Sequence, residues 1–356
     1  MREDKAGGGL NLRKGERLKE KTIKKEQIGK WLEKLGKDYE IWAPVRKNGL
    51  VLFHPIASAK EVVLDFSNSR KTPKDLFFPQ SEVLFSFPEE GVEKEGETVL
   101  QKPRIIFAIR PCDAQSLALL DRVFDSEDYQ DPYYVQRREG TLLLGMACTC
   151  PERSCFCTSL GGSPFEKTHL DLLMADLGDG KYFVEALTQG GEDLMGKDGC
   201  LQEAQEKDRE KLASSKEEAE KKVKSKIVTD GLDKKLDKIF DSPLWDRVHQ
   251  RCLGCGICTY LCSTCHCFAL LDEKDEARVK RIRSWDSCMF SEFTVEASGH
   301  NPRISNRERM RQRVMHKFNY FVKRYGETAC VGCGRCIQNC PVNIDIREII
   351  KEIENE

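Results

Sequence analysis

Two stretches of the chain share one cysteine spacing. "CLGCGICTYLCS" at 252–263 and "CVGCGRCIQNCP" at 330–341 both contain C-x2-C-x2-C-x3-C. In this ferredoxin order, three thiolates of a loop bind one [4Fe-4S] cluster and the fourth, a helical turn further on, binds another. The spacing therefore predicts two clusters with crossed ligands: one on Cys252, Cys255, Cys258 and Cys340, and a second on Cys330, Cys333, Cys336 and Cys262.

Eight thiolates would also make two four-thiolate zinc sites, or remain merely buried thiols. Zinc ribbons pair two C-x2-C units across a longer gap, whereas each stretch here already has four cysteines in the ferredoxin order. The spacing therefore favours iron-sulfur clusters. Gly254, Gly256, Gly332 and Gly334 lie inside the loops, where we expect positive φ angles and close approach of backbone N–H groups to sulfur.

Nine of the 17 cysteines lie outside these motifs. Five are N-terminal: Cys112 follows the strand-like "PRIIFAIR", and Cys148, Cys150, Cys155 and Cys157 form "CTCPERSCFC". The residues alone leave open a third cluster, a single zinc site or structural thiols. Cys265, Cys267 and Cys288, with His266, receive no assignment, and Cys200 has no predicted role.

Composition limits the kind of partner and compartment. A net charge of -1 with 33% charged residues gives no reason to expect nucleic acid or an anionic membrane surface as the partner. The first residues are charged where a signal peptide would be apolar, and the apolar runs are too short to span a membrane. We therefore expect a soluble, cytoplasmic protein, whose odd number of cysteines serves metal or redox chemistry rather than disulfides.

The 356 residues allow two or three domains. We expect a flexible N-terminus at 1–20, an α/β or α+β domain at 21–190, a charged helical spacer at 191–240, and a mainly helical, ferredoxin-like two-cluster domain at 241–356. The alternative reading of the charged segment is a docking surface for a partner.

Two local patterns give testable details. The run at 103–110 predicts a strand, followed by a helix with Asp113 as its N-cap. Between the two cysteine motifs, Met310, Val314, Phe318 and Phe321 fall on one face of a predicted helix. We expect its Arg and Lys side chains to be solvated, the alternative being a pairing with an acidic partner subunit.

The sequence also resembles a known family. This family contains the iron-sulfur beta subunits of sulfhydrogenase-type cytoplasmic NiFe hydrogenases and the related iron-sulfur subunit of anaerobic sulfite reductase, and the resemblance extends over nearly the whole chain. Runs such as "IRPCDAQSLALLDRVF", "CFCTSLGGSP", "WDSCMFSEFTVEASGHNPR" and "RMRQRVMHKFNYF" carry the resemblance, together with both cysteine motifs.

This resemblance implies an electron-transfer subunit without catalytic residues of its own. It would lie in a hetero-oligomer, between a flavin subunit that handles NAD(P)H and a catalytic redox subunit of the hydrogenase, sulfite reductase or heterodisulfide reductase type. It also implies a third [4Fe-4S] cluster on Cys112, Cys148, Cys155 and Cys157, with Cys150 as an extra cysteine, and clusters of this kind suggest an anaerobic cell.

Two further readings remain. A stand-alone reductase, whose N-terminal domain binds flavin or substrate directly, is supported mainly by the thiols around Cys265 and Cys288; a zinc-stabilised scaffold is another. Ser263 departs from the family, which usually has proline there. Without proline the backbone N–H is free, so an added hydrogen bond to sulfur is expected to raise the potential of the second cluster slightly.

Overall fold

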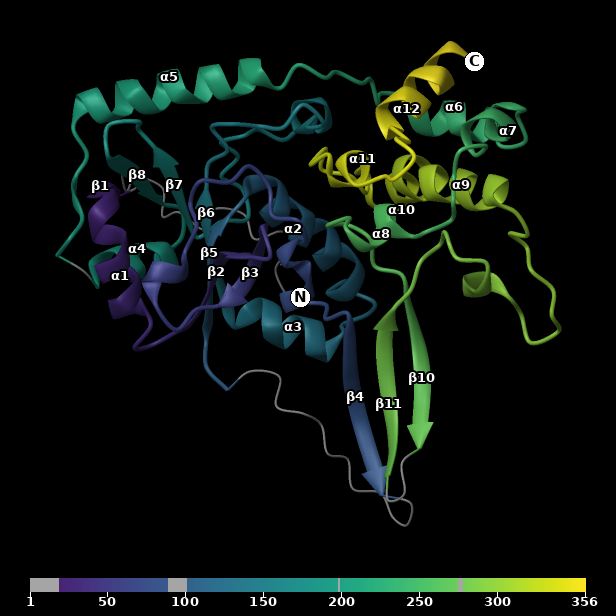
Figure 1. Ribbon diagram of the computed structural model, residues 1–356, viewed down its shortest axis with the longest axis horizontal. Helices are drawn as coiled ribbons and strands as arrows, with labels where there is room; N and C mark the ends of the chain where they lie inside the picture. Colours follow the sequence, from purple (N-terminus) through teal and green to yellow (C-terminus); the bar gives the residue numbers. More distant parts are fainter. Residues whose placement is uncertain (1–18, 89–100, 198, 275–277) are drawn as a thin grey trace, which may run out of the picture.

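The protein consists of a large β-sheet region and a C-terminal helical region that lies against one end of it (Figure 1). The computed structural model describes residues 19–88, 101–197, 199–274 and 278–356. Its strands are β1 Glu20–Lys24, β2 Glu40–Lys47, β3 Leu50–Pro55, β4 Ser81–Pro88, β5 Arg104–Ile109, β6 Thr141–Met146, β7 Leu172–Asp176, β8 Lys181–Ala186, β9 Gln202–Glu203, β10 Phe268–Lys274 and β11 Arg278–Trp285.

The α-helices are short except for α2 and α5. They are α1 Ile28–Leu35, α2 Pro111–Phe124, α3 Pro132–Glu139, α4 Gln189–Gly196, α5 Glu206–Lys222, α6 Leu232–Lys238, α7 Leu244–Val248, α8 Ile257–Tyr260, α9 Asn306–Met315, α10 Phe321–Tyr325, α11 Arg335–Gln338 and α12 Ile346–Asn355. A π-helical turn, His316–Tyr320, joins α9 to α10.

Eight strands in the order β3-β2-β5-β6-β7-β8-β1-β9 form the main sheet. β2, β5, β6 and β7 run parallel at its centre, and the flanking strands are antiparallel. Helices cover both faces: α1 and α4 pack on one through Trp31 and Leu194, and α2 and α3 on the other through Leu120 and Tyr134. The prediction of a mixed α/β N-terminal region is confirmed.

The start of α2 differs from the prediction. Arg110 is the N-cap residue, with extended backbone angles of φ -75° and ψ 145°, and the helix begins at Pro111. Proline disfavours helical angles in the residue before it and is well suited to the first helical position, so it sets the boundary. The prediction of Asp113 as N-cap was wrong, and the Asp113 side chain is free for another contact.

A second sheet joins distant parts of the sequence. β4, from the first half of the chain, pairs with β11, which in turn pairs with β10, and the three strands project together from the body of the molecule (Figure 1). The buried Arg283 of β11 forms an ion pair of 2.6 Å with Glu82 of the neighbouring strand β4. It also pairs with Asp131, which precedes α3. The C-terminal region thus contains a β-hairpin as well as helices, so its mainly helical character is not confirmed.

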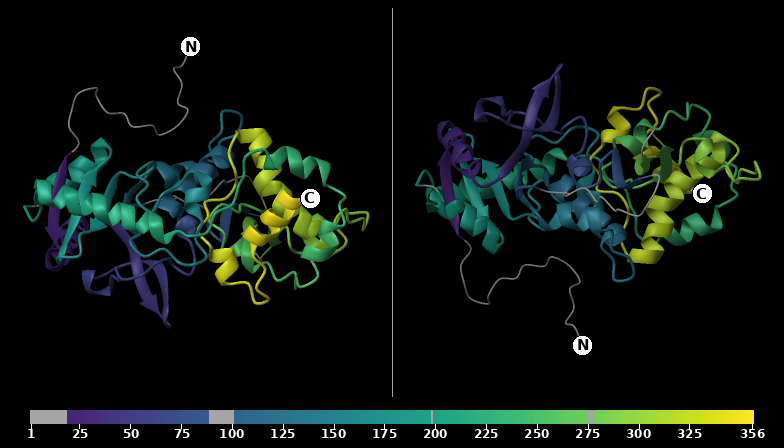
Figure 2. Two further views of the ribbon diagram at one scale, coloured as in Figure 1. Left: turned by 90° about the horizontal axis from the view of Figure 1, so that it is seen from above. Right: turned by 90° about the horizontal axis from the view of Figure 1, so that it is seen from below.

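The C-terminal helices enclose a core of their own. The apolar face predicted at Met310, Val314, Phe318 and Phe321 is buried. The first three of these pack with Trp245 of α7 and the isoleucines of α12. In both views of Figure 2 this region, green to yellow, lies together at one end of the molecule.

The predicted domain limits stay predictions. Residues 1–18 of the expected flexible N-terminus lie outside the described residues, and Glu20 already begins β1. The charged segment at 191–240 includes α5, which passes along the main sheet region toward the C-terminal helices (Figure 1). None of the helices in the described ranges is long and apolar enough to cross a membrane.

Candidate metal centres

Three cavities in the structure are each lined by four or five cysteines. The first is lined by all four cysteines predicted for the first cluster, Cys252, Cys255, Cys258 and Cys340, with Cys336 also at its wall. The backbone N–H of Gly254 donates to the Cys252 sulfur at 3.4 Å, and that of Ile344 to the Cys340 sulfur at 3.2 Å. The last cysteine of the second motif thus lies with the first three of the first motif.

The second cavity, of about 350 Å³, is lined by the four cysteines predicted for the second cluster: Cys262, Cys330, Cys333 and Cys336. Burial raises the pKa of Cys330 to about 11 and that of Cys336 to about 12, so a metal that binds these thiols must displace their protons. Ser263 also lines this cavity. Its side chain is fully buried, and within the described part of the chain its hydroxyl has no hydrogen-bond partner.

The third cavity, of about 340 Å³, brings together Cys112, Cys148, Cys155 and Cys157, and Cys333 of the second motif also lines it. Cys112 and Cys148 meet because they follow β5 and β6, which are neighbours and run parallel. Loops at the carboxyl ends of such strands commonly form ligand sites. The extra cysteine, Cys150, is exposed and does not line the cavity.

Sequence reasoning missed Asn68 at this third cavity. It lies in the segment after β3, and its side-chain amide donates to the backbone oxygen of Cys333 at 3.0 Å and lies 4.0 Å from the Cys155 sulfur. Asn68 therefore bridges the N-terminal cysteines and the second motif. No local pattern in the sequence marks this position.

Two motif glycines are required for close packing between the second and third cavities. Gly332 and Gly334 have φ angles of 64° and 73°, in the left-handed region that favours glycine. A Cβ atom at Gly332 would lie 2.6 Å from the backbone N of Cys157, and one at Gly334 would lie 2.3 Å from the Ser154 hydroxyl. The Phe156 N–H also donates to the Gly332 oxygen at 2.8 Å. The second motif thus packs backbone to backbone on the N-terminal cysteine loop.

The cavities lie in a row. Cys333 lines the third and second cavities, whereas Cys336 and Arg313 line the second and first. The order is therefore third, second, first, with the second in the middle. At the far end of the row Cys255 is exposed, and the neighbouring Leu253 is 65% exposed.

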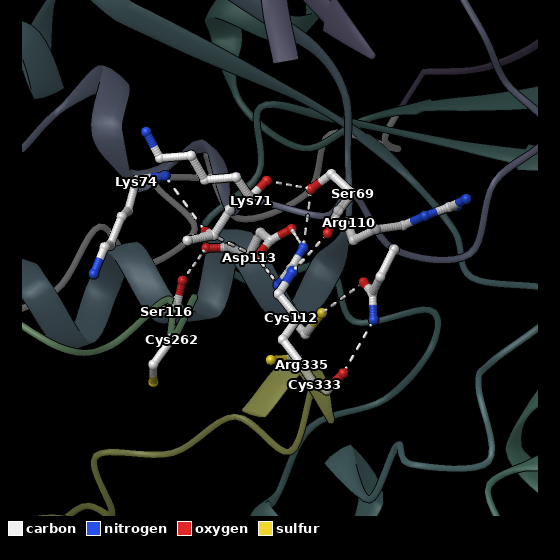
Figure 3. A network of polar contacts seen from close by, with 12 residues as sticks. Ser69, Lys71, Lys74, Arg110, Cys112, Asp113, Ser116, Cys262, Cys333 and Arg335 are labelled. Carbon is white, nitrogen blue, oxygen red and sulfur yellow. Dashed lines mark hydrogen bonds and ion pairs between the residues drawn. The ribbon is translucent and has the colours of Figure 1, made fainter. Parts of the chain in front are cut away.

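A buried ion pair holds this arrangement across the two regions (Figure 3). Arg335, two residues after Cys333, makes two contacts of 2.6 and 2.7 Å with the Asp113 carboxylate and also donates to the Ser69 backbone oxygen at 2.9 Å. Burial would lower the pKa of Arg335, but the adjacent Asp113 carboxylate raises it above the ordinary value. Both side chains are fully buried, so each charge depends on the other.

The helix between the cysteine motifs presents buried cations to the cavities. Arg313 lines the first and second cavities, and Lys317 lines the second. The Lys317 ammonium donates to the Cys262 sulfur at 3.3 Å and to the Ala329 oxygen at 2.9 Å. Burial would lower the pKa of Lys317, but the Cys262 sulfur raises it well above its ordinary value. The prediction that these basic side chains are solvated was therefore wrong for Arg313 and Lys317.

The donor sets suit clusters of several metal ions. Among the residues that the structure describes, no three His, Cys, Asp or Glu side chains are placed to hold a single metal ion. A single Zn²⁺ gathers its sulfurs at about 2.3 Å from one point. At least four cysteines line each of the three cavities, with backbone N–H groups that donate to sulfurs of the first and a buried lysine that donates to a sulfur of the second. Such surroundings stabilise the negative charge of thiolate-bound iron-sulfur clusters.

Comparison with known proteins identifies the class of the C-terminal region. Residues 251–344 match the family model of the 4Fe-4S dicluster domain. This range contains both cysteine motifs and the helix that carries Arg313 and Lys317. The chain is therefore an iron-sulfur protein.

Most of the chain also matches a named relative. Over 330 residues it is 31% identical to sulfhydrogenase 2 subunit beta of Pyrococcus furiosus, a match that covers 92% of this chain and 96% of that protein. The chain thus belongs to the family of iron-sulfur beta subunits of the sulfhydrogenase type, which are electron-transfer subunits, as the sequence resemblance indicated. No solved structure matches the chain.

The Asp113–Arg335 pair is expected to be essential for stability. Asp113→Asn leaves the Arg335 charge buried without its carboxylate, which should cost about 3–5 kcal/mol. Urea unfolding followed by tryptophan fluorescence under anaerobic conditions measures this loss. The control is Glu327→Gln, which breaks a half-exposed pair with Arg122 of α2 and should cost about 1 kcal/mol or less. Similar midpoints for the two variants would contradict the argument.

Proposed function

We propose that the chain is the electron-transfer subunit of a hetero-oligomeric oxidoreductase, with one [4Fe-4S] cluster in each of the three cysteine cavities. The row of cavities is the observation that carries this proposal. The first cluster would be held by Cys252, Cys255, Cys258 and Cys340, the second by Cys262, Cys330, Cys333 and Cys336, and the third by Cys112, Cys148, Cys155 and Cys157.

Bound in such sites, [4Fe-4S] clusters accept and release single electrons at potentials set by ligation, hydrogen bonds and burial. Residues of the chain provide the hydrogen bonds and the charge that would set these potentials. Gly254 and Ile344 direct N–H groups at sulfurs of the first site, and Lys317 places a charge at the second. Because the cavities adjoin one another through Cys333 and Cys336, they would form a continuous path from the sheet region to the exposed surface at Cys255.

A different partner subunit would contact each end of this path. One end would receive electrons from, or return them to, a flavin subunit that handles NAD(P)H, and the other would serve a catalytic redox subunit. The name of the Pyrococcus relative, which is a sulfhydrogenase component, favours a hydrogenase as that catalytic partner. The chain itself would contribute no catalytic residue to the reactions of these partners.

Metal analysis tests the number and placement of the clusters. The anaerobically purified chain should contain about 12 iron and 12 acid-labile sulfide atoms, and Cys155→Ala should contain about 8 of each. The control Cys150→Ala removes the exposed extra cysteine and should retain about 12. A zinc-loaded, colourless protein would refute the iron-sulfur function, and equal iron loss in the two variants would refute the third site. Reduction of sulfite by the chain without partners would favour the stand-alone alternative.

Lys317 is expected to raise the potential of the cluster in the second site. Lys317→Met removes a buried positive charge that stabilises the more negative reduced state, so the midpoint potential should fall on the order of 100 mV. EPR-monitored redox titration measures it. The control is Lys323→Met, at an exposed lysine paired with Asp237, for which solvent screening should leave the potential nearly unchanged. An unchanged potential in Lys317→Met would contradict this role.

The hydroxyl of Ser263 is expected to act on the same cluster. Since it is buried at the second cavity without a protein partner in the described residues, a cluster sulfur is its natural acceptor. Ser263→Ala should lower the potential by tens of millivolts, on the order of one hydrogen bond to a charged group. Ser263→Pro removes the backbone N–H as well and should lower the potential at least as far. The same redox titration decides, and no shift in either variant would exclude the hydrogen bond.

A further inference from the structure

Two cysteines outside the three cavities lie together at the base of the β10–β11 hairpin. Cys267 directly precedes β10, and Cys288 follows the end of β11 by three residues. Phe268 pairs with Trp285, and the Asp286 N–H donates to the Cys267 oxygen at 2.9 Å. The hairpin register therefore fixes both cysteines at the same end of the two strands.

Both thiols line the same cavity. A hydrogen bond between their side chains is the largest cause of the pKa shifts of both cysteines. Cys267 is partly exposed, whereas Cys288 is 7% exposed. Cys267 can therefore react with a molecule from solvent, whereas Cys288 is shielded from solvent.

An open cavity lies beside this pair. Both cysteines line it, together with Phe268, Phe293, Gln312 and His316. The lining combines apolar side chains with hydrogen-bonding groups, as in many small-molecule sites. None of these residues lines the three cysteine cavities.

The pair also lies beside the second site. The sulfur of Cys262, which lines the second cavity, lies 3.2 Å from the hydroxyl of Thr264, three residues before Cys267. The buried Lys74 ammonium donates to the Cys265 oxygen at 2.7 Å. The segment 262–267 therefore connects the proposed middle cluster to the thiol pair over a few residues.

We propose that Cys267 and Cys288 form a redox-active dithiol that reduces small disulfides with electrons from the clusters of this chain. The proposal rests on the proposed function, because that function supplies the electrons. It assigns Cys267 as the attacking thiol and Cys288 as the resolving thiol.

The Cys267 thiolate attacks the substrate S–S bond, which breaks, so that a mixed disulfide forms and the first substrate thiolate leaves. Cys288 then attacks the Cys267 sulfur, releasing the second substrate thiolate and forming the Cys267–Cys288 disulfide. The two cysteine protons go to the two leaving thiolates. Two electrons, one from each of two reduced clusters, and two protons from water regenerate both thiols.

The surroundings of the two sulfurs suit these roles. The hydrogen bond from Cys288 lowers the pKa of Cys267 to about 7, and attacking thiols react best when their pKa is near the ambient pH. The pKa of Cys288 is raised well above its ordinary value, first by that shared hydrogen bond and then by burial. Cys288 therefore stays protonated until the mixed disulfide has formed.

Mass spectrometry tests the pair itself. The full chain, purified anaerobically and treated with diamide, should yield a peptide cross-linked between Cys267 and Cys288, and thiol reduction should release it. Cys267→Ser and Cys288→Ser should each abolish the cross-link. Absence of this cross-link in the wild-type chain would overturn the proposal, whatever the variants do.

Single-turnover kinetics test the electron path. The chain is reduced, freed of excess reductant and mixed with one equivalent of bis(2-hydroxyethyl) disulfide, and recovery of the cluster absorbance is followed. Two clusters should be reoxidised per disulfide consumed, and Cys267→Ser should be slower by about tenfold or more. Cys150→Ser, which removes an exposed thiol elsewhere, should react as the wild type does. Equal rates in wild type and Cys267→Ser would overturn the proposal.

Failure of this proposal differs from failure of the proposed function. A wild-type chain with full iron content and reduced-state EPR signals, but without dithiol chemistry, keeps the electron-transfer function and loses only the dithiol. A chain without iron loses the function and, with it, the electron source, while the cross-link still reports whether the thiols pair.

Discussion

The contact on which the rest of the structure depends is the packing of the second cysteine motif against the N-terminal cysteine loop. Gly332 and Gly334 let two backbones touch where any Cβ atom would clash, and the Arg335–Asp113 pair fixes the same contact from the side. Because this contact is made of backbone and of a fully buried ion pair, it has little freedom to adjust. It sets the spacing between the second and third cavities and thereby makes one row out of sites from two regions of the chain.

The charge of the sites explains the unusual burial of basic residues. Each four-thiolate cluster carries net negative charge, and a buried negative charge requires compensation from nearby cations or hydrogen bonds. Arg313 and Lys317 lie on the helix that passes the first and second cavities, so their burial is stabilising only if negative sulfur is present. Folding of this region and binding of its metal are therefore expected to be coupled, as in other proteins whose ligands converge on a buried metal.

Much of the site could be predicted because cysteine spacing is a local property. The crossed grouping that places Cys340 with Cys252 and Cys262 with Cys330 follows from the C-x2-C-x2-C-x3-C pattern, and the structure gathers these residues around the same cavities. The strand and helix around 104–124 were likewise readable from periodicity. The role of Asp113 was not, since its partner Arg335 is 222 residues away. The pairing of β4 with β11 and the position of Asn68 could not be predicted for the same reason, because local patterns in a single sequence do not indicate which distant segments are in contact.

The basic helix shows where a local rule reached the wrong answer. Its apolar face at Met310, Val314 and Phe318 was read correctly, and by the usual rule the remaining charged residues should face water. The rule assumes that the surroundings of a helix are either apolar core or solvent. Here the helix has a third neighbour, a cavity lined by cysteines, and the side chains of Arg313 and Lys317 lie at it. A charged residue on a helix between two metal-binding motifs is therefore better regarded as a candidate for tuning the metal than as part of a solvated surface.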